Sequence, residues 1–223
     1  MHPGGGLSVS CNRNALGHRR VAAVVGGFIG WCRRYIGLNS QALMLPPLEF
    51  APGRIVCLHV PRGRHHEKDA IIDQLVQFAY RQAKTAIVCA RPALRSRLRE
   101  RLWPQTSVDW LATNAHISRG EAVKLIAASD IPVARALCAN AGTPQTFLGI
   151  LVAAAHRPDL VIYDTSGLDP LGCAAIHYYV RSIGTEFAAV HLSFAKVHGY
   201  GYTATRICPE NGMCVSFESH SAG

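Results

Sequence analysis

The 223-residue sequence lacks paired cysteines, a long apolar run and any internal repeat. Its 8 cysteines form no Cys-x-x-Cys pair, so neither a zinc ribbon nor a disulfide framework is expected. The apolar run 21–31 is shorter than the roughly 20 residues that a transmembrane helix needs, and no small-residue cleavage site follows it. We therefore expect a cytoplasmic protein that contacts a membrane peripherally at most.

Acidic residues are also scarce, with 14 against 23 basic residues and a formal net charge of +9. This excess permits an anionic partner, and a nucleotide, a nucleic acid and a lipid headgroup surface all stay open. Of the 11 histidines, His65 and His66 are the only tight pair, and adjacent side chains rarely converge on one ion. A metal site built from histidines is therefore not expected.

What the sequence does contain is a set of short apolar runs of the kind found in strands buried on both faces of a parallel sheet. These runs are 55–60, 85–90, 159–164 and 186–192. Stretches with helical spacing lie between them, and Asn-Gly within 205–217 signals an antiparallel hairpin. We predict an α/β domain at 45–223, with a mostly parallel sheet flanked by helices, after a leader and extension at 1–44.

Two shorter patterns lie between the second and third runs. Ser118 and Glu121 have the spacing of a capping box, which predicts a helix start. Residues 108–111 are interpreted as a short strand.

The run 159–164 ends on a carboxylate, Asp164, and a Thr-Ser-Gly turn follows. Ligands of open parallel sheets bind at the carboxyl ends of the strands. An aspartate at this position can hold Mg²⁺ beside the phosphates of a nucleotide, usually through water. It can equally make an Asx-turn or cap the next helix, so both interpretations stay open.

The segment 61–69 has the position of a phosphate-binding loop, between a predicted strand and a predicted helix. Such a loop needs Gly-x-x-x-x-Gly-Lys-Ser/Thr, with glycines for close backbone approach and a hydroxyl for Mg²⁺. The chain offers Gly63, Arg64 and Lys68, and Asp69 stands where the hydroxyl is expected. We interpret the loop as degenerate, although its basic side chains can attract an anion.

Residues 156–172 resemble the Walker B strand and D-loop of ABC-type ATPases, where the strand precedes Asp-Glu-Pro-Thr-Ser-Gly-Leu-Asp-Pro. The Glu-Pro pair after Asp164 is missing, and 205–217 is similar to the last hairpin of that family. The resemblance implies a P-loop NTPase-like domain that binds ATP and Mg²⁺ as a homodimer or beneath a membrane transport subunit. Because the missing Glu polarises the attacking water in that family, it also implies weak or lost hydrolysis.

The resemblance implies roles for further residues. Asp164 would bind the metal, and His191 would be the switch histidine that senses the γ-phosphate, although a core histidine stays open. Gln105 would be the Q-loop glutamine. Gly142 and Gln145 would be the remnant of the signature motif, although we prefer to interpret them as the start of a helix at 145–155. The implied nucleotide-binding residues are Gly63, Arg64, Lys68, Asp69, Gln105, Gly142, Gln145, Ser166, Gly167 and Asp169.

Two other interpretations stay open. Residues 164–167 also fit the strand-Asp-Thr-x-Gly pattern of GTPase-like or polynucleotide-kinase-like P-loop enzymes, which should pair strand 85–90 with strand 159–164. An ABC-type ATPase should instead have a helical insert and a small antiparallel subdomain. The damaged loop also suits a non-catalytic scaffold that keeps only the fold.

Overall fold

The computed structural model describes residues 48, 50–60, 67–82, 84–93, 100 and 102–193, together with the backbone of 202–207 and 214–218. The predicted leader 1–44 and the loop residues Gly63 and Arg64 lie outside this part of the chain. The described elements are, in chain order, β1 (Ile55–His59), α1 (Lys68–Arg81), β2 (Ala86–Val88), α3 (Ser107–Ala115), α4 (Arg119–Ala127), the 3-10 helix η2 (Leu137–Ala139), α5 (Gly142–Ala155), β3 (Leu160–Asp164), α6 (Pro170–Ile183), β4 (Ala188–Ser193), β5 (Tyr202–Ile207) and β6 (Cys214–Glu218).

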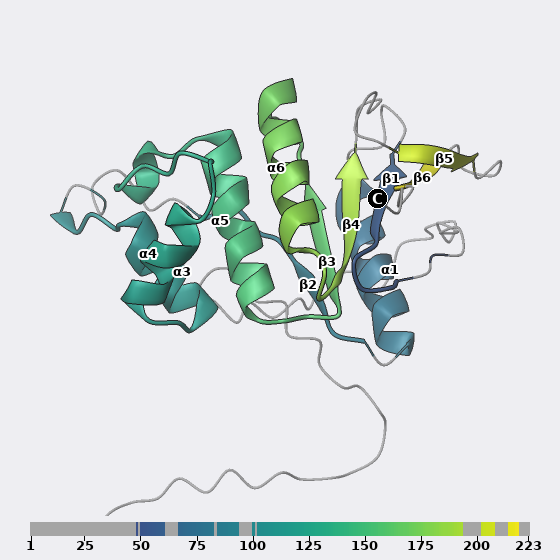
Figure 1. The fold of residues 1–223 in the computed structure, drawn as a ribbon, viewed down its shortest axis with the longest axis horizontal. Helices are drawn as coiled ribbons and strands as arrows, with labels where there is room; N and C mark the ends of the chain where they lie inside the picture. Colours follow the sequence, from purple (N-terminus) through teal and green to yellow (C-terminus); the bar gives the residue numbers. More distant parts are fainter. Residues whose placement is uncertain are drawn as a thin grey trace, which may run out of the picture.

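The strands form one sheet in the order β2-β3-β4-β1-β6-β5. The first four in this order are parallel, and β5 and β6 form an antiparallel hairpin that pairs with β1 (Figure 1). The α/β class is therefore confirmed, and each of the four predicted runs contains a strand. The run 85–90 is only half-buried, however, because β2 is the outermost strand at this edge among the residues the structure describes.

Helices cover both faces of the parallel strands (Figure 1). Alternate strand residues, including Val56, Leu58 and Ile162, pack with Ile71 and Leu75 of α1 in one core cluster. The intervening residues pack with α5 and α6 in a second cluster. Because the strand faces are both covered, the strands read as unbroken apolar runs in the sequence.

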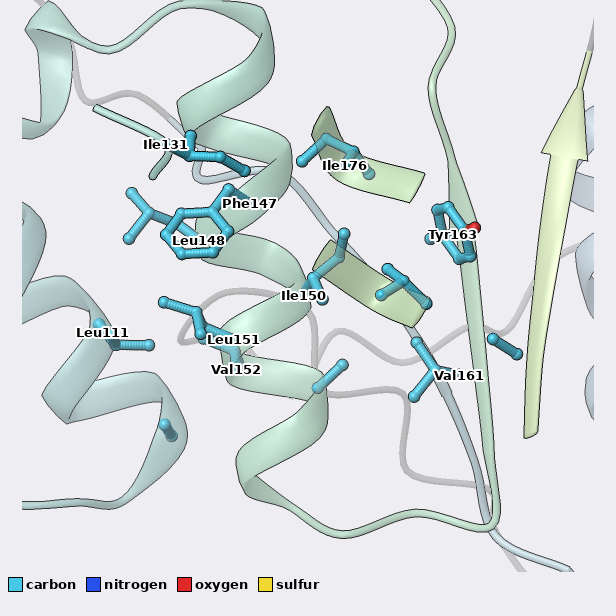
Figure 2. Close-up of a cluster of buried hydrophobic side chains, with 14 of the residues drawn as sticks. Leu111, Ile131, Phe147, Leu148, Ile150, Leu151, Val152, Val161, Tyr163 and Ile176 are labelled. Atoms are coloured by element: carbon cyan, nitrogen blue, oxygen red, sulfur yellow. The ribbon is translucent and has the colours of Figure 1, made fainter. Parts of the chain in front are cut away.

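Helix α5 is apolar on every side and lies between the sheet and the outer helices. Its residues 146–153 are all buried. Figure 2 shows its side chains between Leu111 of α3 on one side and Val161 and Tyr163 of β3 on the other. A helix that is apolar all round is expected to be enclosed in this way. Helices α3 and α4 therefore form an additional outer layer beyond α5.

In the outer layer the structure differs from the strand predicted at 108–111. Residues 108–111 are helical and belong to α3, because the Thr106 side chain caps the helix by accepting a hydrogen bond from the Asp109 amide. The short apolar run fits a strand as well as a helix turn. The capping box of Ser118 and Glu121 is present at the start of α4, as predicted.

The structure combines the two topological features that were expected to separate the P-loop classes. Strand β2 pairs with β3, as expected for a kinase-like enzyme. A helical insert, α3 to α5, nevertheless lies between these two strands in the chain, as expected for an ABC-type fold. The described antiparallel strands, β5 and β6, join the main sheet beside β1 and do not form the separate subdomain that was expected for that fold.

Candidate functional site

The parallel strands place their carboxyl ends at one edge of the sheet, and two oppositely charged side chains meet there. Lys68 is the first residue of α1, which follows β1, and Asp164 is the last residue of β3. The Lys68 ammonium donates a hydrogen bond to Asp164 Oδ2 in an ion pair. The start of α1 and the end of β3 therefore lie together at this edge of the sheet.

Asp164 uses both of its carboxylate oxygens. Besides the Lys68 contact, Oδ1 accepts a hydrogen bond of 2.7 Å from the Ser166 amide, which is the Asx-turn left open by the sequence. Burial raises the pKa of Asp164, but the hydrogen bond and charge of Lys68 and the contacts with Ser166 outweigh it and lower the pKa overall. The carboxylate is therefore charged at neutral pH.

The charge of Asp164 also acts on a neighbouring thiol. Burial first, and then the Asp164 carboxylate, raise the pKa of Cys89. Cys89 is therefore a protonated core thiol and no candidate nucleophile.

The turn after Asp164 is fixed by backbone contacts. The Leu168 amide donates to the Thr165 carbonyl at 3.1 Å, and Gly167 has φ +75, a conformation that favours glycine. Asp169 is the N-cap of α6, where its side chain accepts a 2.6 Å hydrogen bond from the Gly172 amide. The carboxylate of Asp169 is thus engaged in starting a helix.

Arg91 belongs to this edge of the sheet but was not among the residues singled out from the sequence. It follows β2, and its guanidinium donates to the Ser166 carbonyl in the turn after β3. The signal available in the sequence was an arginine directly after a buried apolar run. Only the pairing of β2 with β3 reveals that this arginine reaches the Asp164 turn.

His191 lies in the core, on the opposite face of the sheet from the Lys68–Asp164 pair. Its ring stacks on Tyr163 with a centroid distance of 4.9 Å. Its Nδ1 lies 3.6 Å from Cys57 Sγ, and its Nε2 lies 2.9 Å from Thr165 Oγ1. Side chains alternate between the faces of a strand, so Tyr163 and Asp164 point to opposite sides. This environment is that of the core histidine left open by the sequence.

The protonation of His191 follows from this position. Burial, the nearby His177 and then His59 lower the pKa of His191 to about 3, against a smaller opposing effect of Asp164. The ring is neutral at physiological pH. It therefore adds no positive charge beside Lys68 and Asp164.

The remaining candidates divide between the turn and the helical layer. Gly142 begins α5, where a Cβ atom would lie 3.0 Å from a Leu168 methyl, so the start of this helix packs on the turn. Gln145 instead donates from Nε2 to the Asn140 carbonyl at 2.8 Å. Gln105 lies before α3, where its carbonyl accepts a 2.9 Å hydrogen bond from the Leu137 amide. The structure thus gathers Lys68, Arg91, Asp164, Ser166, Gly167 and Gly142 around the turn.

The described side chains fit a metal that arrives with a ligand better than a resident metal. Among the residues the structure describes, no group of three or more His, Cys, Asp or Glu side chains could hold an ion. Asp164 is a single carboxylate beside a helix N-terminus. Mg²⁺ is typically bound in this way, by one or two carboxylates together with substrate phosphates and water.

Comparisons with known proteins bear on the fold of this chain. No family model and no curated protein matches it. A solved structure described as a metal-chelate type ABC transporter in an inward-facing conformation matches with a TM-score of 0.53 and 14% identity, over 70% of this chain and 69% of that chain. A model of ribosome-bound archaeal Pelota and ABCE1 matches over 65% of this chain and 29% of that chain, with a TM-score of 0.41 and 12% identity.

The first comparison is a likeness of fold, and the second is too distant to add to it. No helix in the described ranges has the length and apolar character needed to cross a bilayer. The chain is thus a mixed α/β protein whose fold is similar to that of an ABC transporter protein.

Proposed function

We propose that the chain binds a Mg²⁺-nucleotide, such as ATP, at the carboxyl edge of its sheet and hydrolyses it weakly or not at all. The observation that carries this proposal is the contact between Lys68 and Asp164. A cation at the first residue of a helix is suited to bind phosphate, because the first N–H groups of the helix also favour an anion. A carboxylate at the end of a neighbouring parallel strand is suited to the accompanying metal.

The solvent exposure of Lys68 and Asp164 allows a ligand to replace their contact with each other. The Lys68 side chain is 37% exposed and that of Asp164 is 16% exposed, so a ligand can approach both from solvent. A Mg²⁺-nucleotide offers an anion to Lys68 and a cation to Asp164. Opening the ion pair on binding would then leave neither charge without a counterpart, and Mg²⁺ would supply charge neutralisation for the phosphates.

Weak hydrolysis follows from what surrounds Asp164. A hydrolase needs a group that positions and activates the attacking water. The next carboxylate along the chain is Asp169, which already caps α6. His191 lies on the other face and is neutral. The turn 165–168 holds no second carboxylate, and the other acidic residues described near Lys68, Glu67 and Asp69, lie at the start of α1 and not directly after Asp164.

The proposed partners rest on the fold and on the net charge. The likeness of fold to an ABC transporter protein supports a second copy of the chain or a membrane transport subunit as a partner of a cytoplasmic nucleotide-binding protein. The net charge of +9 keeps nucleic acid open as an alternative.

Calorimetric titration with Mg²⁺-ATP tests the proposal. We expect binding by the native chain, and a loss of affinity of about tenfold or more for Lys68→Ala and for Asp164→Asn, because each removes a charge-assisted contact. Lys124→Ala, an exposed lysine on α4, is the matched control and should bind as the native chain does. Equal affinities in all four proteins would place the nucleotide elsewhere.

A second candidate is a GTPase-like or polynucleotide-kinase-like enzyme, which the pairing of β2 with β3 favours. Titration with Mg²⁺-GTP distinguishes it by a preference for GTP over ATP, and transfer of labelled phosphate to an oligonucleotide with a free 5′-hydroxyl distinguishes the kinase. If neither nucleotide binds, the chain is a scaffold that keeps the fold alone.

A further inference from the structure

We infer that Arg91 is a second cationic contact for the phosphate chain of the ligand, and that it makes the site select nucleoside di- and triphosphates over monophosphates. This inference rests on the proposed nucleotide site and names the residue that would set its specificity. Its basis is the position of Arg91, the charge around Lys68 and the donor groups that the Arg91 guanidinium leaves available.

The position of Arg91 is set by the sheet. The Cys89 amide donates to the Ile162 carbonyl at 2.8 Å, which continues the pairing of β2 with β3 beyond Val88. Arg91 therefore emerges at the carboxyl edge, one strand away from Asp164. Its hydrogen bond to the Ser166 carbonyl completes a chain of contacts along this edge, from Arg91 through Ser166 and Asp164 to Lys68.

The charges around Lys68 show why a second cation is needed. The ammonium of Lys68 is paired with Asp164, and Glu67 and Asp69 flank it in the sequence at the start of α1. The described residues at this helix start thus carry more negative than positive charge. A polyanionic ligand gains little attraction from Lys68 until the ion pair opens.

Arg91 differs from Lys68 because no acidic side chain among the residues the structure describes pairs with it. Its guanidinium contacts a neutral carbonyl, and the ion pairs among the described residues join Lys68 with Asp164 and Arg119 with Asp109. The residue is exposed. A guanidinium has five N–H donors in a planar fork that matches phosphate oxygens, so one hydrogen bond to a carbonyl leaves most of them available.

The separation of the two cations leads to the specificity. Neighbouring strands lie about 4.8 Å apart, and Arg91 follows β2 whereas Lys68 meets Asp164 at the end of β3. A chain of two or three phosphates can contact both cations where they stand, at Ser166 and at Asp164. The single phosphate of a nucleoside monophosphate must draw the two side chains together to contact both, so it gains less from Arg91.

The test compares Arg91→Gln with Arg157→Gln, which makes the same change in charge at an exposed position before β3, at the opposite edge of the sheet. Affinities for Mg²⁺-ATP, Mg²⁺-ADP and AMP are measured by calorimetry, with inorganic tripolyphosphate as a probe that lacks a base. We expect Arg91→Gln to weaken binding of ATP, ADP and tripolyphosphate by about tenfold or more, as for one charge-assisted hydrogen bond. Affinity for AMP should change by less than about twofold.

The controls separate charge, geometry and folding. Arg157→Gln should bind all four probes as the native chain does. Arg91→Lys keeps the charge without the planar fork and should recover only part of the lost affinity. Circular dichroism and thermal unfolding of Arg91→Gln show whether losing the hydrogen bond to Ser166 has disturbed the fold.

Three results would overturn the inference. If Arg91→Gln and Arg157→Gln both bind ATP as the native chain does, while Lys68→Ala does not, the proposed function stands and the role of Arg91 is wrong. If Arg91→Gln weakens the binding of AMP as much as the binding of ATP, Arg91 only stabilises the turn through its hydrogen bond to the Ser166 carbonyl. If the native chain binds none of the probes, the proposed function and this inference fail together.

Discussion

The buried histidine provides a prediction that does not depend on any ligand. Burial, with His177 and His59, lowers the pKa of His191 to about 3 in the folded chain, from an ordinary value of 6.5. Between these two values the unfolded chain binds a proton at this residue and the folded chain does not. The free energy of unfolding must therefore fall as the pH is lowered through this window.

The size of the effect follows from the two pKa values. Well inside the window, one proton favours the unfolded state by about 1.4 kcal/mol for each pH unit. Relative to pH 8, the native chain should lose about 2 kcal/mol of stability at pH 5 from His191 alone. Asp164 contributes in a different range, because its lowered pKa stabilises the fold above the ordinary value of 3.8 and that contribution is lost only at lower pH.

Urea unfolding at pH 8, 7, 6 and 5 measures this dependence. His191→Gln should lower the stability at pH 8 by about 1–3 kcal/mol, because it disturbs buried contacts with Thr165 and Cys57. It should also remove about 2 kcal/mol of the difference between pH 8 and pH 5. His116→Gln, which removes an exposed histidine, is the control substitution. An equal pH dependence in the native chain and in His191→Gln would refute the reasoning.

Three further predictions concern packing, a buried amide and catalysis. Gly149→Ala places a Cβ atom 2.5 Å from the Ala90 carbonyl oxygen and should lower the free energy of unfolding by about 1–3 kcal/mol, measured by thermal unfolding. Gly120→Ala, where the nearest atom lies 3.9 Å from the added Cβ, should instead stabilise α4 by up to about 1 kcal/mol. Asn140→Ala should cost about 2 kcal/mol or more in urea unfolding, because this buried amide accepts one backbone hydrogen bond at 2.8 Å and donates others to the loop before η2. Phosphate release from Mg²⁺-ATP should stay well below about 1 s⁻¹; a rate near this value that Asp164→Asn abolishes would show normal hydrolysis.

The strands were the most predictable part of the fold, because a strand buried on both faces is a continuous apolar run whatever the order of the strands in the sheet. The run 85–90 shows that such a run does not tell an edge strand from a central one. Its apolar residues predicted a fully buried strand, but β2 is an edge strand and is half-buried. The helix at 107–115 was missed over 108–111 because four residues are too few to separate a period of two from one of 3.6.

The places of two candidate residues were predictable from local sequence, because Asp164 ends an apolar run and Lys68 precedes a stretch with helical spacing. The structure brings them together in an ion pair, and their role in binding a ligand stays a prediction. Arg91 could not be found, because its place depends on which strand pairs with β3. The environment of His191 likewise depends on register, since Cys57 and Tyr163 are its partners on the two adjacent strands.

The place of β1 in the sheet has a consequence for how the protein is made. Its two neighbours are β4 and β6, and its contact between Cys57 and His191 joins residues 134 positions apart. On a ribosome, β1 and the segment leading to Lys68 emerge long before either partner strand. Closing so long a loop is entropically costly, and strands paired over such distances form slowly. The apolar residues of β1 must therefore wait unpaired during synthesis, when exposed apolar strands are prone to aggregate.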